Sequence, residues 1–347
     1  MKTKMKILGV CGAQGALLFP LRKHEIVANV EPRGVFHSKN EEQWRLNFGD
    51  VPFLKKLDQL KSVKRGEIDV IVGSPSCGHS SAFSYSRKKT LGDPKSDPSV
   101  NMFIESIKRF SPKVFLMENL PKLLELIPLE NWFLEFEDYE IITLCHSMKY
   151  LGNSQETRKR MIMVGVHRDS GLQPYYFSRI FSVNEPKKFK DLYKSIRKEL
   201  NYRELGDVKL AMYDYRDKEK KTLTVDRIKY LWRHDFKEYY KWPMIGTKMK
   251  TLPGVYRNRK NSFPMTARPS SRQFNHKGLP MGLEEYRVIM GFPEKFKVYF
   301  DESDRVYWLN KGRNTLTKGA VYEVGLWFKK CLLSSLRGST MPPSSLF

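Results

Sequence analysis

The sequence predicts an α/β protein built on a parallel, doubly wound sheet. Short apolar runs of strand length recur through the first 170 residues, and helical stretches fit between them. Strands that alternate with helices favour a parallel sheet with helices on both faces. Acidic or reactive residues follow several of the runs, and ligands bind such sheets at the carboxyl ends of the strands. A chain of 347 residues has room for one large domain and a smaller one.

Six apolar runs are the predicted strands: Lys6–Val10, Glu25–Val30, Asp69–Val72, Lys113–Met117, Glu140–Leu144 and Arg160–Val166. A helix over Val100–Arg109 fits between the third and fourth of them. Glu31, Cys77 and Glu118 each fall just after a predicted strand. We therefore expect these three side chains to meet at one edge of the sheet.

The pattern changes after this region and predicts a second domain. Residues 182–262 contain 22 Lys and Arg against 11 Asp and Glu, interleaved with aromatic residues, and the strand periodicity fades. Amphipathic periodicity returns at Leu283–Met290 and Ala320–Leu333. We predict a catalytic and cofactor-binding domain at 1–180, a basic domain at 181–280, a segment returning to the first domain at 281–336 and a flexible tail at 337–347.

The charge balance indicates a polyanionic partner. Lys and Arg total 62 against 38 Asp and Glu, a net charge of +24, and cations gain by displacing counterions from phosphates. A basic protein with no nucleic-acid role and an anionic membrane surface are the alternatives. Four cysteines without paired or metal-like spacing favour a reduced, intracellular protein and no metal site. We expect a monomer with no signal peptide or membrane span.

Three groups of residues carry candidate chemistry. Cys77 lies in a turn rich in Pro and Gly (SPSCGHSS) and suits a nucleophile, although a buried structural cysteine is the plainer interpretation. Glu118 suits a general acid, an ion-pair partner or a helix N-cap. Arg158 and Arg160 alone indicate a solvated turn. Together, a thiolate, a carboxylic acid and an arginine pair suit attack on an electron-poor heterocycle.

Five segments in order strengthen that interpretation: SPSC, MENLPKLL, GNSQETRKRMIMVGV, EEYRVIMGFPEKF and GRNTLTKGAVYEVG. This series resembles the ordered motifs of DNA cytosine-5 methyltransferases and spans most of the chain. The resemblance implies a Rossmann-like S-adenosylmethionine-dependent methyltransferase sheet with a second, smaller target-recognition domain. The basic middle segment is where that family places its variable target-recognition region.

The resemblance also implies a mechanism. Cys77 would add to C6 of a cytosine, while Glu118 would hold or protonate N3 and the exocyclic amine. Arg158 and Arg160 would position the base and the flanking phosphate and support the thiolate. The activated C5 would take a methyl group from S-adenosylmethionine. The family flips its target base out of double-stranded DNA to allow this attack.

The same resemblance assigns binding residues. Those for the cofactor are Val10, Gly12, Ala13, Gln14, Gly15, Glu31, Asp50, Pro75 and Asn314. Within this set, Glu31 would take the ribose hydroxyls, Asp50 would lie on the adenine side, and Asn314 would close the pocket. Those for DNA are His79, Ser81, Arg257, Arg259 and Lys260.

Two other functions fit parts of the sequence. The family includes a branch that methylates cytosine-5 in tRNA, and a basic middle region also suits RNA. A catalytically silent DNA-binding relative would keep the fold and the charge. Retention of both Cys77 and Glu118 favours an active enzyme over this second alternative.

Overall fold

The computed structural model describes residues 4–13, 15–32, 37–76, 97–151, 158–183, 210–213, 220–223, 291–297 and 322–337. The chain divides into two compact units. The first comprises Met1–Asn153, Thr157–Glu185 and Gly319–Phe347, and the second comprises Ser154–Glu156 and Pro186–Lys318. The domain boundaries predicted from the sequence stay predictions.

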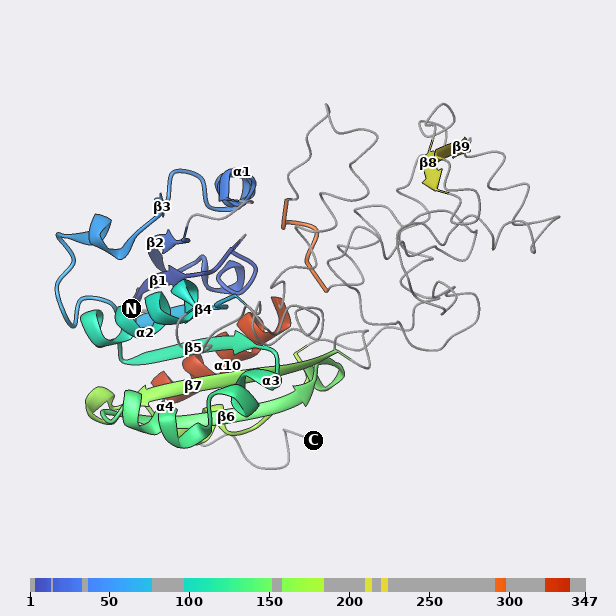
Figure 1. The fold of residues 1–347 in the computed structure, drawn as a ribbon. Helices are drawn as coiled ribbons and strands as arrows, with labels where there is room; N and C mark the ends of the chain where they lie inside the picture. The colour runs from blue at the N-terminus through green and yellow to red at the C-terminus, as the bar shows by residue number, and fades with distance from the viewer. Residues whose placement is uncertain are drawn as a thin grey trace. The chain divides into compact units, whose positions relative to one another are not determined.

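A seven-stranded sheet forms the centre of the first unit among the described residues (Figure 1). Its order is β3-β2-β1-β4-β5-β7-β6. The strands are β1 Lys6–Val10, β2 Glu25–Val30, β3 Phe53–Leu54, β4 Val70–Gly73, β5 Val114–Asn119, β6 Tyr139–Ser147 and β7 Lys159–His167. Every strand predicted from the apolar runs is therefore present, and β3 is an additional short edge strand.

The sheet is mixed, which corrects the expectation of a parallel one. β1 to β5 pair in parallel with one another, whereas β7 lies between β5 and β6 and runs antiparallel to both. Parallel neighbours need a crossover connection, usually a helix. In the part of the connection from β6 to β7 that the structure describes, only the short 3-10 helix η5 (Met148–Leu151) is present.

Helices cover both faces of the sheet, because buried apolar side chains point to both faces along its strands. On β4, Val70 and Val72 belong to one core cluster and Ile71 to the other, because successive side chains of a strand point to opposite faces. The helix α10 (Tyr322–Arg337) packs into the first cluster through Val324, Trp327 and Phe328. The second cluster lies under α2, α3 and α4, which have the bounds Pro98–Phe110, Lys122–Leu126 and Leu129–Glu135.

The helix α10 returns from the C-terminal part of the chain to the first unit. It begins two residues later than the predicted helix at 320–333 and ends at Arg337. Gly325 lets it approach the backbone closely, since a Cβ there would lie 2.2 Å from the carbonyl oxygen of Leu17. The indole Nε1 of Trp327 donates to the carbonyl oxygen of Arg179 at 2.9 Å. The helix predicted over 283–290 lies outside the described residues.

The other described elements are a helix, four 3-10 helices and a second, two-stranded sheet. Helix α1 (His37–Phe48) precedes the edge strand β3, and Trp44 on it stacks against Phe48 with ring centroids 3.9 Å apart. The remaining 3-10 helices are η1 Phe19–Leu21, η2 Leu57–Leu60, η6 Arg168–Ser170 and η7 Pro174–Phe177. In the second unit, β8 (Leu210–Tyr213) and β9 (Lys220–Leu223) form an antiparallel pair. Among the described helices, none has the length and apolar character needed to cross a membrane.

Candidate active site at the carboxyl edge of the sheet

Two clusters of polar groups lie where β1, β2, β4 and β5 end. The first, here called the β1–β2 cluster, comprises the turn after β1 together with Asn29 and Glu31 of β2 and its exit. The second, here called the Glu118 network, comprises Ser74, Pro75, Glu118, Asn119 and Arg160. Both occupy the edge at which open α/β sheets bind ligands.

The turn after β1 is fixed by hydrogen bonds to the end of β2. Three successive backbone N–H groups donate: Cys11 to the carbonyl oxygen of Val30 at 2.8 Å, Gly12 to Oδ1 of Asn29 at 3.2 Å, and Ala13 to Oε2 of Glu31 at 2.9 Å. Cys11 and Ala13 have φ angles of 55° and 44°. Left-handed backbone is costly for residues with a Cβ, so these bonds hold a strained turn in place.

Asn29 organises this turn and was missed by the sequence interpretation. Its side chain is fully buried, and its Nδ2 donates back to the carbonyl oxygen of Ala13 at 3.4 Å. A Cβ on Gly9 or on Gly12 would lie 2.6 Å from Oδ1 of Asn29, so both glycines leave room for this amide. The available signal was a polar residue inside the apolar run EIVANV, since buried amides are retained where they bond to backbone.

Glu31 follows β2 directly, as predicted, and presents a carboxylate beside the turn. Burial raises its pKa to about 7, partly offset by the hydrogen bond from the Ala13 N–H. Each carboxylate oxygen accepts more than one hydrogen bond. Glu31 therefore retains acceptor capacity for the hydroxyl groups of a ligand lying against the turn.

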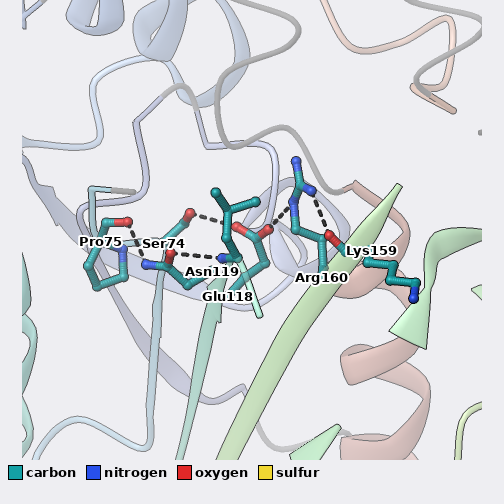
Figure 2. A network of polar contacts seen from close by, with 7 residues as sticks. Ser74, Pro75, Glu118, Asn119, Lys159 and Arg160 are labelled. Carbon is teal, nitrogen blue, oxygen red and sulfur yellow. Dashed lines mark hydrogen bonds and ion pairs between the residues drawn. The ribbon is translucent and has the colours of Figure 1, made fainter. Parts of the chain in front are cut away.

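Glu118 is the centre of the second cluster (Figure 2). Nε of Arg160 lies 2.7 Å from its Oε1, and the hydroxyl of Ser74 donates to its Oε2 at 2.7 Å. The side chains of Glu118 and Arg160 are 2% and 14% exposed, so water screens their attraction poorly. Charge-assisted hydrogen bonds of this kind are shorter and stronger than neutral ones. Both carboxylate oxygens of Glu118 are thereby held in one orientation.

The register of the strands explains why Ser74, Glu118 and Arg160 meet. Gly73 pairs with Met117 across β4 and β5, so Ser74 and Glu118 follow at the same level. Glu118 pairs directly with Ile162 of β7, and Arg160 lies two residues before Ile162. In an antiparallel pair such a diagonal neighbour is within reach of a long side chain. Glu118 is thus inside β5 rather than after it, which corrects the predicted strand end at Met117.

Asn119 connects β5 to the chain that leads out of β4. Its Nδ2 donates to the carbonyl oxygen of Pro75 at 3.0 Å, and its Oδ1 accepts from the N–H of Leu120 at 2.8 Å. Pro75 was predicted to line the cofactor site and is buried. The contact with Asn119 fixes the backbone of Pro75, and its place in cofactor binding stays a prediction.

Three other predicted site residues, Val10, Gly15 and Arg158, are also among the described residues. Val10 is fully buried in the core cluster that also contains Phe103. Gly15 has a φ of 80° and packs on α1, where a Cβ would lie 2.3 Å from the ring of Phe48. Arg158 is 4% exposed, and its carbonyl oxygen accepts from the N–H of Met148 at 2.8 Å. Their predicted contacts with cofactor and base stay predictions.

Asp50 is not brought to the carboxyl edge. It is exposed in the turn between α1 and β3, on the amino side of that strand, and β3 ends at Leu54 beside β2. Eight predicted site residues lie outside the described residues: Gln14, Cys77, His79, Ser81, Arg257, Arg259, Lys260 and Asn314. Their assignments remain those of the sequence.

Comparison with a protein-family model identifies the family of the chain. The model of C-5 cytosine-specific DNA methylases matches residues 24–309, which is most of the chain. The chain belongs to this family. No curated protein matches the sequence closely enough to count as a relative.

Solved structures of methyltransferases share the fold. A DNA modification methyltransferase encoded in an Escherichia coli prophage superposes with a TM-score of 0.62 at 14% identity, covering 96% of this chain and 100% of its own. The Entamoeba histolytica methyltransferase EhMeth gives 0.64 at 14% identity, covering 96% and 99%. The Schizosaccharomyces pombe Dnmt2 methyltransferase gives 0.56 at 14% identity, again covering 96% and 99%. At these identities the likeness shows the fold alone.

Cytosine-5 methylases of this family take their methyl group from S-adenosylmethionine. The β1–β2 cluster fits such a ligand, because Glu31 presents a carboxylate to hydroxyl groups and Gly12 keeps the turn free of a side chain beside Asn29. In nucleotide-binding sheets an acid after the second strand bonds the ribose in the same way. Glu31 and the turn Cys11–Ala13 are therefore the described residues that would hold the methyl donor.

We predict that binding of S-adenosylmethionine weakens as pH falls through about 7, the pKa of Glu31. The raised pKa means that Glu31 becomes protonated below this pH, and a neutral acid accepts hydroxyl hydrogen bonds less well. The dissociation constant should rise by up to about tenfold per pH unit below the pKa. Calorimetric titration with S-adenosylmethionine between pH 8 and 5.5 measures this.

The matched control for that titration is Glu31→Gln, which keeps the shape of the side chain and cannot ionise. It should bind more weakly at pH 8 and show only the pH dependence of the ligand itself. If the dissociation constant changed with pH equally in the wild type and in Glu31→Gln, the assignment of Glu31 would be contradicted.

Proposed function

We propose that the protein is a DNA (cytosine-5-)-methyltransferase that attacks C6 of a flipped cytosine with Cys77. The observation that carries the proposal is the Glu118 network, in which Arg160 and Ser74 orient a buried carboxylate at the carboxyl edge. Ser74 precedes Cys77 by three residues, and three residues of chain span at most about 11 Å. This short connection supports placing the proposed nucleophile and acid in one site.

The residues of this chain divide the work. The thiolate of Cys77 would add to C6 while Glu118 donates a hydrogen bond or proton to N3, so that the ring accepts the electron pair. Arg160 would hold the carboxyl group in line for the base, and Arg158 would support the base and the thiolate. S-adenosylmethionine supplies the methyl group for C5. Loss of the C5 proton would then expel Cys77 and restore the aromatic ring.

Glu118 can also accept a hydrogen bond from the exocyclic amine of the base while it keeps its present partners. Each of its oxygens accepts one bond in the structure, from Arg160 and from Ser74. A carboxylate oxygen has a second lone pair, so the exocyclic amine of a cytosine can bind without displacing either residue. A preorganised group of this kind costs little reorganisation in the reaction.

Double-stranded DNA is the proposed substrate. The net charge of +24 supports binding to a phosphate backbone, whose contacts help offset the few kcal/mol that base flipping costs. The segment with Arg257, Arg259 and Lys260 is the proposed recognition surface. We propose that the protein acts as a monomer.

The test is transfer of tritium from labelled S-adenosylmethionine to duplex DNA and, in parallel, to tRNA. We expect transfer to DNA, and a covalent adduct that survives denaturation when the duplex contains 5-fluorocytosine, which blocks loss of the proton at C5. Transfer to tRNA alone would overturn the choice of substrate. Binding of DNA without transfer or adduct would indicate a silent relative instead.

A further inference from the structure

The N-terminus of α2 contacts two segments of the candidate site: the turn after β1, through Cys11, and the segment after β4, through Ser76. Asp97 is the N-cap of this helix, and its carboxylate accepts from both the N–H and the hydroxyl of Ser99. The hydroxyl of Ser99 in turn accepts from the N–H of Ser76 at 2.7 Å. The carbonyl oxygen of Ser99 accepts from the thiol of Cys11 at 3.5 Å. Ser99 is 5% exposed, so its own hydroxyl and carbonyl groups are largely shielded from water.

The direction of these hydrogen bonds is determined by the chemistry of the groups. A serine hydroxyl has one hydrogen to donate and two lone pairs. Because Ser99 gives its hydrogen to Asp97, its lone pairs face the N–H of Ser76. The charge on Asp97 polarises the hydroxyl, and bonds in such a chain strengthen one another. Asp97 thereby does more than cap the helix.

Three consecutive residues before Cys77 are each held by a different partner. Ser74 bonds to Glu118, Pro75 accepts from Asn119, and Ser76 donates to Ser99. The first two partners belong to β5, and the third belongs to α2. Ser76 is the residue joined to Cys77, so the contact with Ser99 is the last of the three along the chain.

We propose that Ser99 is a positioning residue for the nucleophile, acting through the backbone of Ser76. The inference rests on the proposed role of Cys77. Ser99 does not act on the base itself. It fixes the direction in which the chain leaves β4, and a displacement of about 1 Å at a reacting group costs roughly a hundredfold in rate.

The test compares Ser99→Ala with the wild type in the rate of adduct formation on a 5-fluorocytosine duplex. We expect the rate at saturating DNA and S-adenosylmethionine to fall roughly ten- to a hundredfold, with the KM values for both substrates unchanged. Ser99→Thr keeps the hydroxyl and should restore most of the rate. The thiol of Cys11 bonds to the backbone of Ser99, so calorimetric affinity for S-adenosylmethionine should also stay unchanged.

Ser106→Ala is the matched control on the same helix. Ser106 is fully buried and its hydroxyl donates to the carbonyl oxygen of Phe103 at 2.7 Å, away from both segments. It should lower the melting temperature, because a buried hydrogen bond is lost, and leave the adduct rate at the wild-type value. Equal slowing by both variants would show that Ser99 contributes stability alone.

A second variant keeps the test decisive if Ser99→Ala does not fold. Ser76→Pro removes the N–H that Ser99 accepts and leaves the cap of α2 intact. It should slow adduct formation in the same way. Wild-type rates in the variants would overturn the role of Ser99, whereas absence of any adduct with the wild-type protein would overturn the proposed function instead.

Discussion

Cys77→Ser is expected to reduce methyl transfer to DNA by at least about 10³-fold, the scale on which removal of a nucleophile acts. A serine hydroxyl is far less ionised at neutral pH than a thiol, so it adds to C6 too slowly to start the reaction. The measurement is tritium transfer under single-turnover conditions, together with the yield of the denaturation-resistant adduct. Neither product should form above background.

Cys145→Ser is the matched control for this prediction. Cys145 lies on β6, is free and is exposed, so its thiol is accessible to reagents and oxidants in solution. Its replacement should leave transfer and adduct formation unchanged. Equal transfer by Cys77→Ser and the wild type would exclude Cys77 as the nucleophile. Loss of activity in Cys145→Ser would show that the thiol of Cys145 is needed instead.

The sequence predicted the strands well because burial dictates their composition. Runs such as DVIV and KVFLM are apolar on both faces, as strands covered by helices must be. The helix α2 was also readable, and its start at Pro98 follows from an N-cap aspartate with proline in the first turn. The direction of β7 could not be predicted, because composition does not distinguish a strand that pairs in parallel from one that pairs antiparallel.

The candidate site was predictable only in part. Glu31 and Glu118 were found because acids at strand ends are unusual among apolar runs. Asn29 and Ser99 were not, because their roles depend on partners that are 17 and 23 residues away in the chain. Buried amides and hydroxyls become informative only when the groups that they bond are known. The pairing of Glu118 with Arg160 likewise needed the register of β5 against β7.

Glu118→Gln is the second change with a large expected effect. We expect the rate of methyl transfer to fall by roughly 10²–10⁴-fold, the range for removing a general acid. Glutamine retains the length of the side chain, but its amide is too weak an acid to transfer a proton to N3 of the base. Adduct formation should slow in parallel, because addition of Cys77 to C6 requires the ring to accept an electron pair. Single-turnover transfer and adduct rates measure both.

The neighbours of Glu118 determine how well this variant folds. Arg160 and Ser74 each donate to one carboxylate oxygen, and glutamine offers only one oxygen. Arg160 can only donate, so the oxygen of glutamine should turn to it, while the hydroxyl of Ser74 can rotate and accept from the new NH₂ group. The hydrogen bonds can thus be kept, but the ion pair is lost, and we expect a lower melting temperature. Activity must therefore be compared well below that temperature.

Ser74→Ala separates the chemistry of Glu118 from its orientation. This variant keeps the carboxyl group and the ion pair with Arg160 and removes one charge-assisted hydrogen bond, worth about 1.5–3 kcal/mol. Because Arg160 still orients the carboxyl group, only part of this energy should be lost from the transition state, and methyl transfer should fall by no more than about tenfold. If Ser74→Ala were as inactive as Glu118→Gln, orientation of the carboxyl group would be the limiting factor. If Glu118→Gln kept wild-type transfer, the acid would have to be sought elsewhere at the edge of the sheet.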